Sequence, residues 1–320
     1  GIAMTLKLNL TVILTAGALC FGCTTADPEA EGGDENVAEA AQALELSNSQ
    51  QLNGTFLNGT FLYGVRFNGV RFNGVRFNGV RFNGTSLEGT PENESITVSD
   101  TAFAGADMDA VLGDNSAASI HIVSISTTDV PGALSYEIES GGSNVCGSSG
   151  AKALLVPGRW NYLTGGLSQD SDHFTVACRG AAIAKCAEWG YRDLDNWSET
   201  NGGNTHTVAG TYFHEACTRM VRADYCGDGH AHTVTGTLID VYDTAGIQTE
   251  STSMALEAEW SASGANCVKH VRWTTAADGD VEDYIKANCP SAWAGPDDAT
   301  ANAACGSSSS TYHTANGYSS

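Results

Sequence analysis

The pattern of apolar and polar positions divides the chain into segments of different character. An apolar run from Leu8 to Phe21 follows a single cationic residue, Lys7. It is too short to remain as a membrane-spanning helix. Residues 24–50 are acidic and alanine-rich, with almost no large apolar side chains. Such a segment cannot offset the entropy of ordering, so we expect an extended tether in which like charges repel.

The end of the apolar run predicts export. Gly22 immediately precedes Cys23, which resembles a bacterial lipoprotein signal whose cysteine is diacylated and becomes the mature N-terminus. Cys20 stands three places before Cys23, where leucine is usual, so a plain secretory peptide cut nearby stays as the alternative. We interpret residues 1–23 as a signal peptide that starts at Met4. Either form of the signal places the mature protein outside the cytoplasm.

A period of five residues governs the next segment, 51–90. Leucine or phenylalanine recurs eight times at this spacing, and a glycine follows each of them two places later. This period fits neither a helix nor a flat strand, but it fits a square β-coil that turns a corner every five residues. The unit resembles the pentapeptide-repeat family, whose small-residue position is occupied here by Val65, Val70, Val75 and Val80. Only two coils would form, so we expect this segment to pack on the next domain or on another molecule.

Charge excludes one class of partner. The chain has 37 acidic and 15 basic residues and a net charge of −22, and such a field repels the phosphate backbone of nucleic acids. The repeat carries single arginines that would surround one coil as a ring and form no groove: Arg66, Arg71, Arg76 and Arg81. We interpret them as solvated surface charges, with anion binding and attraction to acidic neighbouring segments as alternatives.

The remainder of the chain predicts an α+β domain over residues 91–295. Residues 91–175 alternate between apolar and polar positions and have Ser, Thr and Gly-rich turns, as β-strands do. From residue 176 onward, helix-like and strand-like patterns alternate. A weakly ordered, low-complexity tail is expected over 296–320.

Two helices and three further elements are expected in the mixed part. One helix covers 181–189 and is closed by Gly190, and a second covers 214–226 and is closed by Gly227. Strands are expected over the ranges 237–242 and 268–274, and a strand or short helix over 254–260.

Cysteine usage predicts covalent cross-links. Removal of Cys20 with the signal and lipidation of Cys23 leave eight cysteines: Cys146, Cys178, Cys186, Cys217, Cys226, Cys267, Cys289 and Cys305. An even number in an exported chain favours up to four disulfides, whose pairing the sequence leaves open. Cys217 and Cys226 would lie on opposite sides of an unbroken helix and about 13 Å apart, so neither can bridge the other. The predicted fold is therefore a disulfide-stapled α+β domain preceded by a short pentapeptide-repeat-like β-coil.

The same cysteines are the first candidates for catalysis. Cys178 stands at the start of a predicted helix, where the dipole favours a thiolate, whereas Cys226 stands at the opposite end of its helix. The same spacing argument excludes a bridge from Cys178 to Cys186 if both lie on one helix. We favour disulfides over thiol chemistry because the count is even and the chain is exported.

Asp224 is the principal candidate for acid–base chemistry. It falls on the apolar stripe of the second predicted helix, near the carboxyl end, so it needs an arginine, a histidine or turn amides as partner. We favour a structural role, in which Asp224 holds the turn at 227–229. The catalytic alternative pairs it with His214, His230 or His232.

Metal binding is a weaker possibility. His230 and His232 would share one face of a strand and could hold a metal with Asp228 or His206, but no third ligand is fixed by spacing. Acidic residues at 278–283 do not fit the EF-hand pattern, so a solvated turn is preferred there. No nucleotide or dinucleotide fingerprint is present, and we expect no cofactor.

Several local motifs carry a more specific resemblance. Ala223–Cys226 reads Ala-Asp-Tyr-Cys, follows Ala-Cys-Thr-Arg-Met-Val-Arg and precedes Gly-Asp-Gly. Further matches lie at Ala181–Tyr191, at Gly236-Thr237 with Asp240–Asp243, and at Glu259-Trp260. Over roughly 146–289 the chain resembles the ADYC-domain family of secreted, myxobacterial-type bacterial proteins. The resemblance identifies the type of domain but implies no activity for it.

Two hypotheses of function follow. In the first, an exported, lipid-anchored protein of the outer membrane or the extracellular space presents the domain as a binding or structural module. The membrane is then a partner through Cys23, and a protein or polysaccharide is a partner at the surface. In the second, the domain is an extracellular or envelope hydrolase with acid–base residues around Ala223–Cys226. Convergence of these residues in one pocket would favour the hydrolase.

Overall fold

The computed structural model describes the chain from residue 50 onward, with gaps. The described residues are 50–52, 57, 66–72, 75–91, 95, 97–128, 130, 132–161, 163–170, 172–192, 196–201, 204–250, 254–276, 279–295, 305 and 312–316. The predicted signal peptide, Cys23 and nearly all of the tether lie outside them. No helix in the described ranges is long and apolar enough to cross a bilayer.

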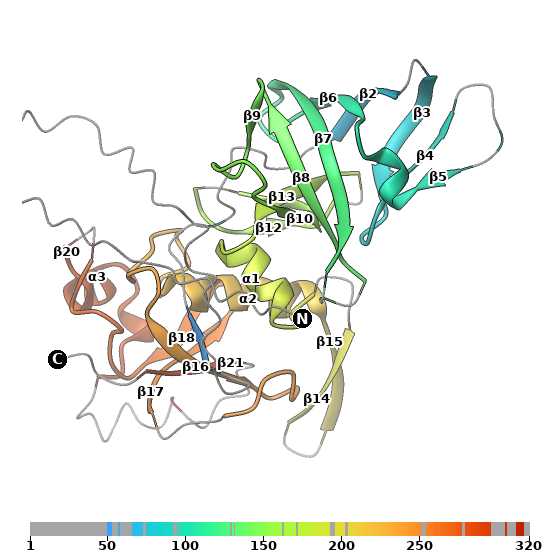
Figure 1. Ribbon diagram of the computed structural model, residues 1–320. Helices are drawn as coiled ribbons and strands as arrows, with labels where there is room; N and C mark the ends of the chain where they lie inside the picture. The colour runs from blue at the N-terminus through green and yellow to red at the C-terminus, as the bar shows by residue number, and fades with distance from the viewer. Residues whose placement is uncertain are drawn as a thin grey trace, which may run out of the picture. The chain divides into compact units, whose positions relative to one another are not determined.

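The larger of the two main antiparallel sheets in the described part of the chain contains the second half of the repeat and the N-terminal half of the domain (Figure 1). Its main strands follow the order β13, β10, β8, β7, β6, β2, β3, β4, β5, and β9 pairs with β8. Their bounds are β2 Arg66–Phe72, β3 Val75–Phe82, β4 Leu87–Pro91, β5 Val98–Ser99, β6 Asp107–Val111, β7 Ala117–Thr127, β8 Leu134–Ser140, β9 Ser143–Asn144, β10 Ala153–Pro157 and β13 Phe174–Cys178. The predicted β-rich character of residues 91–175 is confirmed.

The smaller sheet has five strands in the order β1, β16, β21, β17, β18. Their bounds are β1 Gln50–Leu52, β16 Leu238–Asp243, β17 Ala255–Ser261, β18 Gly264–Val268 and β21 Tyr312–Asn316. Three two-stranded ribbons complete the strands: β11 Arg159–Trp160 with β12 Leu167–Ser168, β14 Asn196–Asn201 with β15 Asn204–Ala209, and β19 Thr275–Ala276 with β20 Gly279–Asp280. β21 lies between β16 and β17, so part of the expected weakly ordered tail forms a strand within this sheet.

Within the described residues, three α-helices accompany the sheets: α1 Ala182–Glu188, α2 Gly210–Arg222 and α3 Val281–Asn288, with short 3₁₀ turns η2 Asp100–Phe103 and η3 Pro290–Ala292. α1 packs on the larger sheet, where Ile183 and Ala187 share an apolar cluster with Leu154 and Val156 of β10. α2 packs on the smaller sheet, because its apolar stripe meets β16, β17 and β18. The two helices are joined by a disulfide, which links the apolar layers of both sheets.

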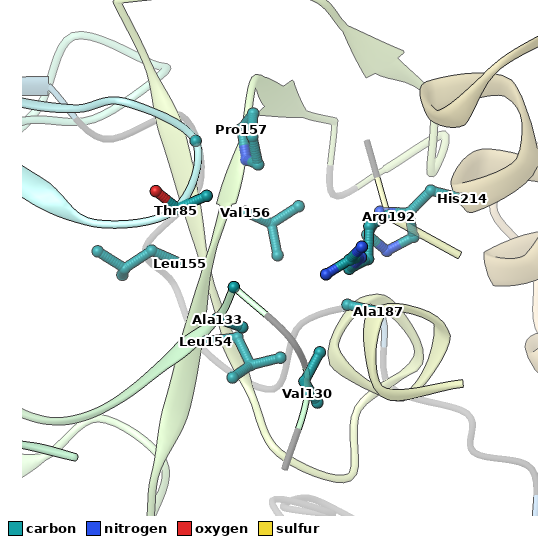
Figure 2. A pocket seen from close by; sticks show the side chains of 12 residues that line it. Thr85, Val130, Ala133, Leu154, Leu155, Val156, Pro157, Ala187, Arg192 and His214 are labelled. Carbon is teal, nitrogen blue, oxygen red and sulfur yellow. The ribbon is translucent and has the colours of Figure 1, made fainter. Parts of the chain in front are cut away.

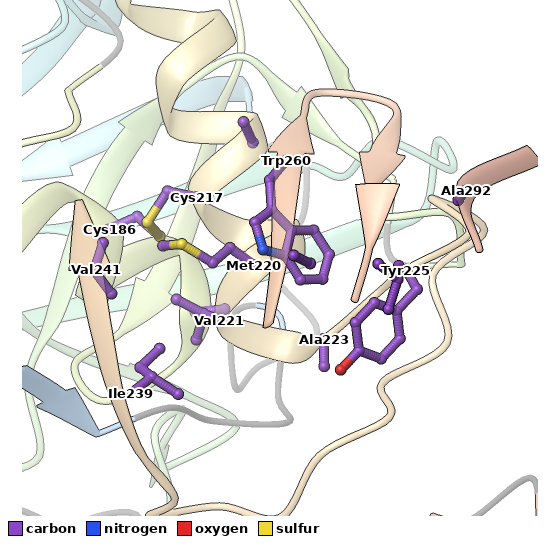
Figure 3. Close-up of a cluster of buried hydrophobic side chains, with 14 of the residues drawn as sticks. Cys186, Cys217, Met220, Val221, Ala223, Tyr225, Ile239, Val241, Trp260 and Ala292 are labelled. Atoms are coloured by element: carbon purple, nitrogen blue, oxygen red, sulfur yellow. A yellow bond between two sulfur atoms is a disulfide. The ribbon is translucent and has the colours of Figure 1, made fainter. Parts of the chain in front are cut away.

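The largest apolar cluster lies between α2 and the smaller sheet (Figure 3). Met220 and Val221 of α2 face Ile239 and Val241 of β16, and Trp260 of β17 packs beside them; all five are fully buried. The Cys186–Cys217 bridge lies within the same cluster. Burial of this much apolar surface is the main stabilising contribution to this half of the domain.

Where the structure describes the repeat, at residues 66–72 and 75–89, it forms antiparallel strands in place of the expected square coil. β2 pairs with β6 and with β3, and β3 pairs with β4. In each strand the register slips by one residue, between Phe67 and Gly69 in β2 and between Phe77 and Val80 in β3. A bulge inserts one residue that has no partner, so a five-residue unit occupies four ladder positions. Four is even, so successive units return to the same face of the sheet, which a flat strand with a period of five could not do.

The end of the repeat shows the consequence of this register. Val80 and Phe82 are buried, whereas Arg81 between them is exposed and forms an ion pair of 2.6 Å with Glu88 on β4. Phe82 packs on Phe174 of β13 with a ring-centroid distance of 5.7 Å. The repeat therefore completes the core of the following domain, in line with the expectation that it packs on a neighbour.

Four disulfides pair all eight predicted cysteines: Cys146–Cys178, Cys186–Cys217, Cys226–Cys289 and Cys267–Cys305. The expectation that Cys217 does not bridge Cys226 is confirmed. Cys178 does not bridge Cys186 either, but the placement of Cys178 at a helix start is wrong, because it is the last residue of β13 and α1 begins at Ala182. Because no thiol remains among these eight, Cys178 and Cys226 cannot act as nucleophiles in this state.

Two predicted elements differ from the structure. The first helix is confirmed, but the second begins earlier and ends at Arg222, because Ala223 adopts the left-handed conformation with φ of 52°. The strand predicted over 268–274 is wrong: β18 ends at Val268, and the chain then turns inward so that Arg272 reaches the end of α2. α3 was not predicted.

The fold predicts that the repeat and the domain unfold together. Phe82→Ala removes a buried ring from the shared core and should lower the free energy of unfolding by about 3–5 kcal/mol in one cooperative transition. Urea denaturation of the oxidised protein, followed by circular dichroism, measures this. Leu163→Ala, whose side chain is 63% exposed, is the matched control and should change stability little. A separate early transition for the repeat would contradict the shared core.

Candidate functional site

The turn after α2, residues 223–229, contains the motif that dominated the sequence analysis. It begins at Ala223, whose left-handed backbone ends the helix. Asp224 is fully buried at this point, and its backbone N–H still donates to the carbonyl of Arg219. Asp224 therefore lies beyond the end of α2, whereas the sequence analysis had placed it on the last turn of the helix.

The Asp224 carboxylate is surrounded by donors. Arg219 Nη1 lies 2.5 Å from Oδ2, and Arg222 Nη1 lies 3.7 Å from the same oxygen. The backbone N–H groups of Asp228 and Gly229 donate to the carboxylate at 3.0–3.2 Å. Burial raises the pKa of Asp224, and the two guanidinium groups oppose that shift and favour the ionised form. This geometry is the predicted structural role, in which Asp224 holds the turn.

The arginines also tie this turn to distant loops. Arg219 donates to the carbonyl oxygens of Thr164 and Ala262, and Arg222 donates to the carbonyl of Gly229 at 2.5 Å. Both side chains are almost fully buried. Charge that is buried in this way is stable only when each donor is paired, and here one carboxylate and several carbonyls supply the acceptors.

Two glycines of the turn are required by close backbone contact. Gly227 and Gly229 have φ of 67° and 94°, which side-chain-bearing residues rarely adopt. A Cβ on Gly227 would lie 1.9 Å from the carbonyl oxygen of Ser263, and one on Gly229 would lie 1.8 Å from that of Leu163. Both positions therefore require glycine for the loops to meet.

Tyr225, next to Asp224, organises a second buried ionic group. Its hydroxyl donates to Glu257 at 2.8 Å and accepts the backbone N–H of Arg272 at 2.8 Å. Arg272 pairs with both carboxylate oxygens of Glu257 at 3.0 Å and donates to the carbonyls of Met220 and Val221 at the end of α2. Burial raises the pKa of Tyr225 well above its usual value, and the nearby carboxylate of Glu257 acts in the same direction.

The fourth residue of the motif provides a covalent link. Cys226 bridges to Cys289, directly after α3, and Tyr284 of that helix donates to Asp228 Oδ2 at 2.8 Å. Asp280 caps α3 by accepting the N–H of Asp283. The described part of the acidic stretch that was considered as a calcium loop therefore forms the N-terminus of α3. Asp278 lies outside the described residues.

The described contacts of His214, His230 and His232 are with groups other than the Asp224 carboxylate. His232 is buried against the ring of Tyr284 at a centroid distance of 4.4 Å, and His230 is exposed. Asp228 is engaged by Tyr284 and by the backbone N–H of His230. His206 lies on β15. Among the residues that the structure describes, no three His, Cys, Asp or Glu side chains come together as a metal site requires.

A cavity of about 210 Å³ lies between the larger sheet and the helices (Figure 2). Its wall is mainly apolar: Val130, Ala133, Leu154, Val156, Pro157 and Ala187. Two nitrogen-bearing side chains, Arg192 and His214, line it as well. His214 Nε2 lies 2.8 Å from the carbonyl of Ile183; a carbonyl only accepts, so this nitrogen carries the proton.

Of the four acid–base candidates, only His214 lines this cavity. Asp224 is enclosed by arginines and backbone amides, and His230 and His232 pack around Tyr284. Sequence reasoning missed Arg192, although it directly follows Tyr191, the last residue of a motif that had been recognised. The cavity wall comes from β10, α1, α2 and connecting loops, so its residues show no regular spacing along the chain.

Comparison with known families agrees with this architecture. A family model described as ADYC domain matches residues 100–274, more than half of the chain. A second model, pentapeptide repeats, matches residues 51–89 in eight copies. No curated protein and no solved structure matches the chain.

The Asp224 site yields a stability prediction. Asp224→Asn leaves Arg219 and Arg222 buried without their carboxylate, and we expect a loss of about 3–5 kcal/mol in the free energy of unfolding. Chemical denaturation with the disulfides intact measures it. Asp172→Asn, a substitution of the same chemistry at an exposed position, should stay within about 0.5 kcal/mol of the parent. Equal stability of both variants would show that the carboxylate is dispensable to the turn.

Removal of a single hydroxyl tests the second ionic group. Tyr225→Phe preserves the ring but leaves the N–H of Arg272 without its acceptor, so stability should fall by about 1–3 kcal/mol. Tyr212→Phe on α2, which keeps its edge-to-face contact with Phe213, serves as the control. The measurement is again the urea midpoint, and a loss no greater than that of the control would contradict the assignment.

Proposed function

The chain belongs to the ADYC-domain family, and from this premise we propose that it is an exported, lipid-anchored cell-surface protein whose domain acts as a binding or structural module. The observation that carries the proposal is the pairing of all eight cysteines beyond residue 23 in disulfides. Such cross-links point to an oxidising environment, since cytosolic thiols are kept reduced.

The anchor and the partners follow from the sequence. Diacylation of Cys23 would hold the protein at the outer membrane, and the acidic tether of residues 24–50 would extend the domain away from it. Cleavage without lipidation would instead release the domain outside the cell. A surface protein or polysaccharide is the partner that this placement suggests, and the net charge of −22 disfavours nucleic acid.

The dispersal of the acid–base candidates supports a module over a hydrolase. General acid–base catalysis needs groups within hydrogen-bonding reach of one reacting atom. Asp224 is already saturated by arginines and amides, and His214 is the only member of the set at the cavity. The motif Ala223–Cys226 thus has a structural explanation in each of its four positions.

The proposal is tested on the mature protein from its native cell. We expect an N-terminal mass that corresponds to diacylated Cys23, no free thiol among the remaining cysteines, and the pairs Cys146–Cys178, Cys186–Cys217, Cys226–Cys289 and Cys267–Cys305. Non-reducing peptide mapping and membrane fractionation measure these. Cys23→Ser is the control and should shift the protein to the soluble exported fraction. A cytoplasmic protein with reduced thiols would refute the proposal.

A further inference from the structure

We propose that the gap between β16 and β17 is a binding groove for an extended polypeptide strand, and that a second copy of this chain fills it with its own residues 312–316. This inference rests on the proposed role as a binding module and identifies a partner for it. In the structure the chain fills the groove itself, with β21.

The origin of β21 marks it as a strand added to the domain. β16, β17 and β18 lie within the region 100–274 that matches the ADYC domain, whereas β1 and β21 lie outside it. β21 nevertheless occupies the middle of the smaller sheet, antiparallel to β16 on one side and to β17 on the other (Figure 1). Among the described residues, β16 and β17 do not pair with each other, and the width of one strand separates them by about 9–10 Å.

The groove requires an occupant. Without β21, the facing backbone N–H and C=O groups of β16 and β17 would lose their ladder partners, which is costly for buried groups. Fully buried residues pair with β21 from both sides: Asp240, Val241, Ala258, Glu259 and Trp260. An extended segment satisfies both edges at once through its main chain, and this is how strand addition gives affinity.

The charge beside the groove determines which segment fits. The fully buried residues Asp240 and Glu259 pair in register with Ala315 and His313. Burial raises the pKa of Tyr242, the other partner of His313, to about 12, and acidic neighbours act in the same direction. An acidic side chain entering here would be repelled. Residues 299–320 contain no Asp or Glu, although the chain has 37 of them, so this segment is compatible with the groove.

The same segment can reach a groove in its own chain or in a neighbour. Cys305 bridges to Cys267 of β18, and six Gly, Ser and Thr residues, 306–311, separate Cys305 from Tyr312. A linker of this composition is flexible and imposes no single direction. Two copies that exchange their segments form two Cys267–Cys305 bridges between chains in place of two within chains, so the number of bonds is unchanged. Anchoring at one membrane would raise the local concentration of copies.

The first test asks whether the groove binds a separate strand. A protease site replaces Ser307–Ser310 in the full chain, which is folded, oxidised and only then cleaved. The fragment with β21 should stay bound through gel filtration, and a labelled peptide of residues 311–320 in excess should displace it, as followed by fluorescence anisotropy. The peptide with Thr314→Pro, which lacks a ladder N–H, should bind at least about tenfold more weakly. The peptide with Ser319→Pro, outside β21, is the matched control and should bind like the parent.

Three results of this test would overturn the groove. They are loss of the fragment on cleavage with no uptake of peptide, equal affinity for the Thr314→Pro peptide, and equal uptake of peptide by the uncleaved protein, whose own strand occupies the site.

The second test asks whether a second copy supplies the strand. Parent full-length chains, one with heavy isotopes and one without, are refolded and oxidised together at high concentration. Non-reducing peptide mapping should then find Cys267 of one label joined to Cys305 of the other in a dimer fraction. The other three bridges are internal controls and should join peptides of one label.

A second copy is refuted as the partner if Cys267–Cys305 joins only peptides of one label, or if all four bridges mix labels equally. Both tests use purified protein, so their failure is distinguishable from failure of the proposed export and anchoring, which N-terminal mass and membrane fractionation measure.

Discussion

The pairing of buried charge at the end of α2 is the constraint on which the mixed half of the domain depends. Arg219, Arg222 and Arg272 are withdrawn from water, and each must find acceptors at a cost that only good geometry offsets. Asp224 and Glu257 satisfy most of this need, and backbone carbonyls satisfy the rest. The end of the helix, the glycine turn and the chain after β18 therefore take the positions that these ion pairs allow.

This constraint explains why some predictions from sequence succeeded and others did not. α1 was predictable because an apolar period is followed by a terminating glycine, Gly190. The end of α2 was not, because the helical period continues through Asp224, whereas the backbone turns left-handed at Ala223 and the Asp224 carboxylate pairs with Arg219 beyond the helix end. A strand over 268–274 was expected from its apolar residues, yet Arg272 leaves the sheet to reach Glu257. Local pattern contains no information about such a distant partner.

The candidate site shows the same limit. Sequence reasoning identified Asp224 and its structural role, since an aspartate before two glycines commonly holds a turn. The even cysteine count predicted disulfides. It could not predict which cysteines pair, because the two cysteines of each bridge lie far apart along the chain. No pattern in the sequence indicated the cavity, because Arg192, Leu154 and His214 meet only after α1 has packed on the larger sheet and α2 lies beside α1, joined to it by the Cys186–Cys217 disulfide.

The bulged strands of the repeat have a consequence for how such proteins change over evolutionary time. Each of the two bulged five-residue units that the structure describes advances the ladder by an even number of positions. Tandem duplication or loss of one whole unit would thus lengthen or shorten a strand without exchanging its inner and outer faces, whereas a gain of one or two residues outside a bulge would disturb the alternation. Copy number becomes a variable that a lineage can alter while keeping the hydrophobic interior intact.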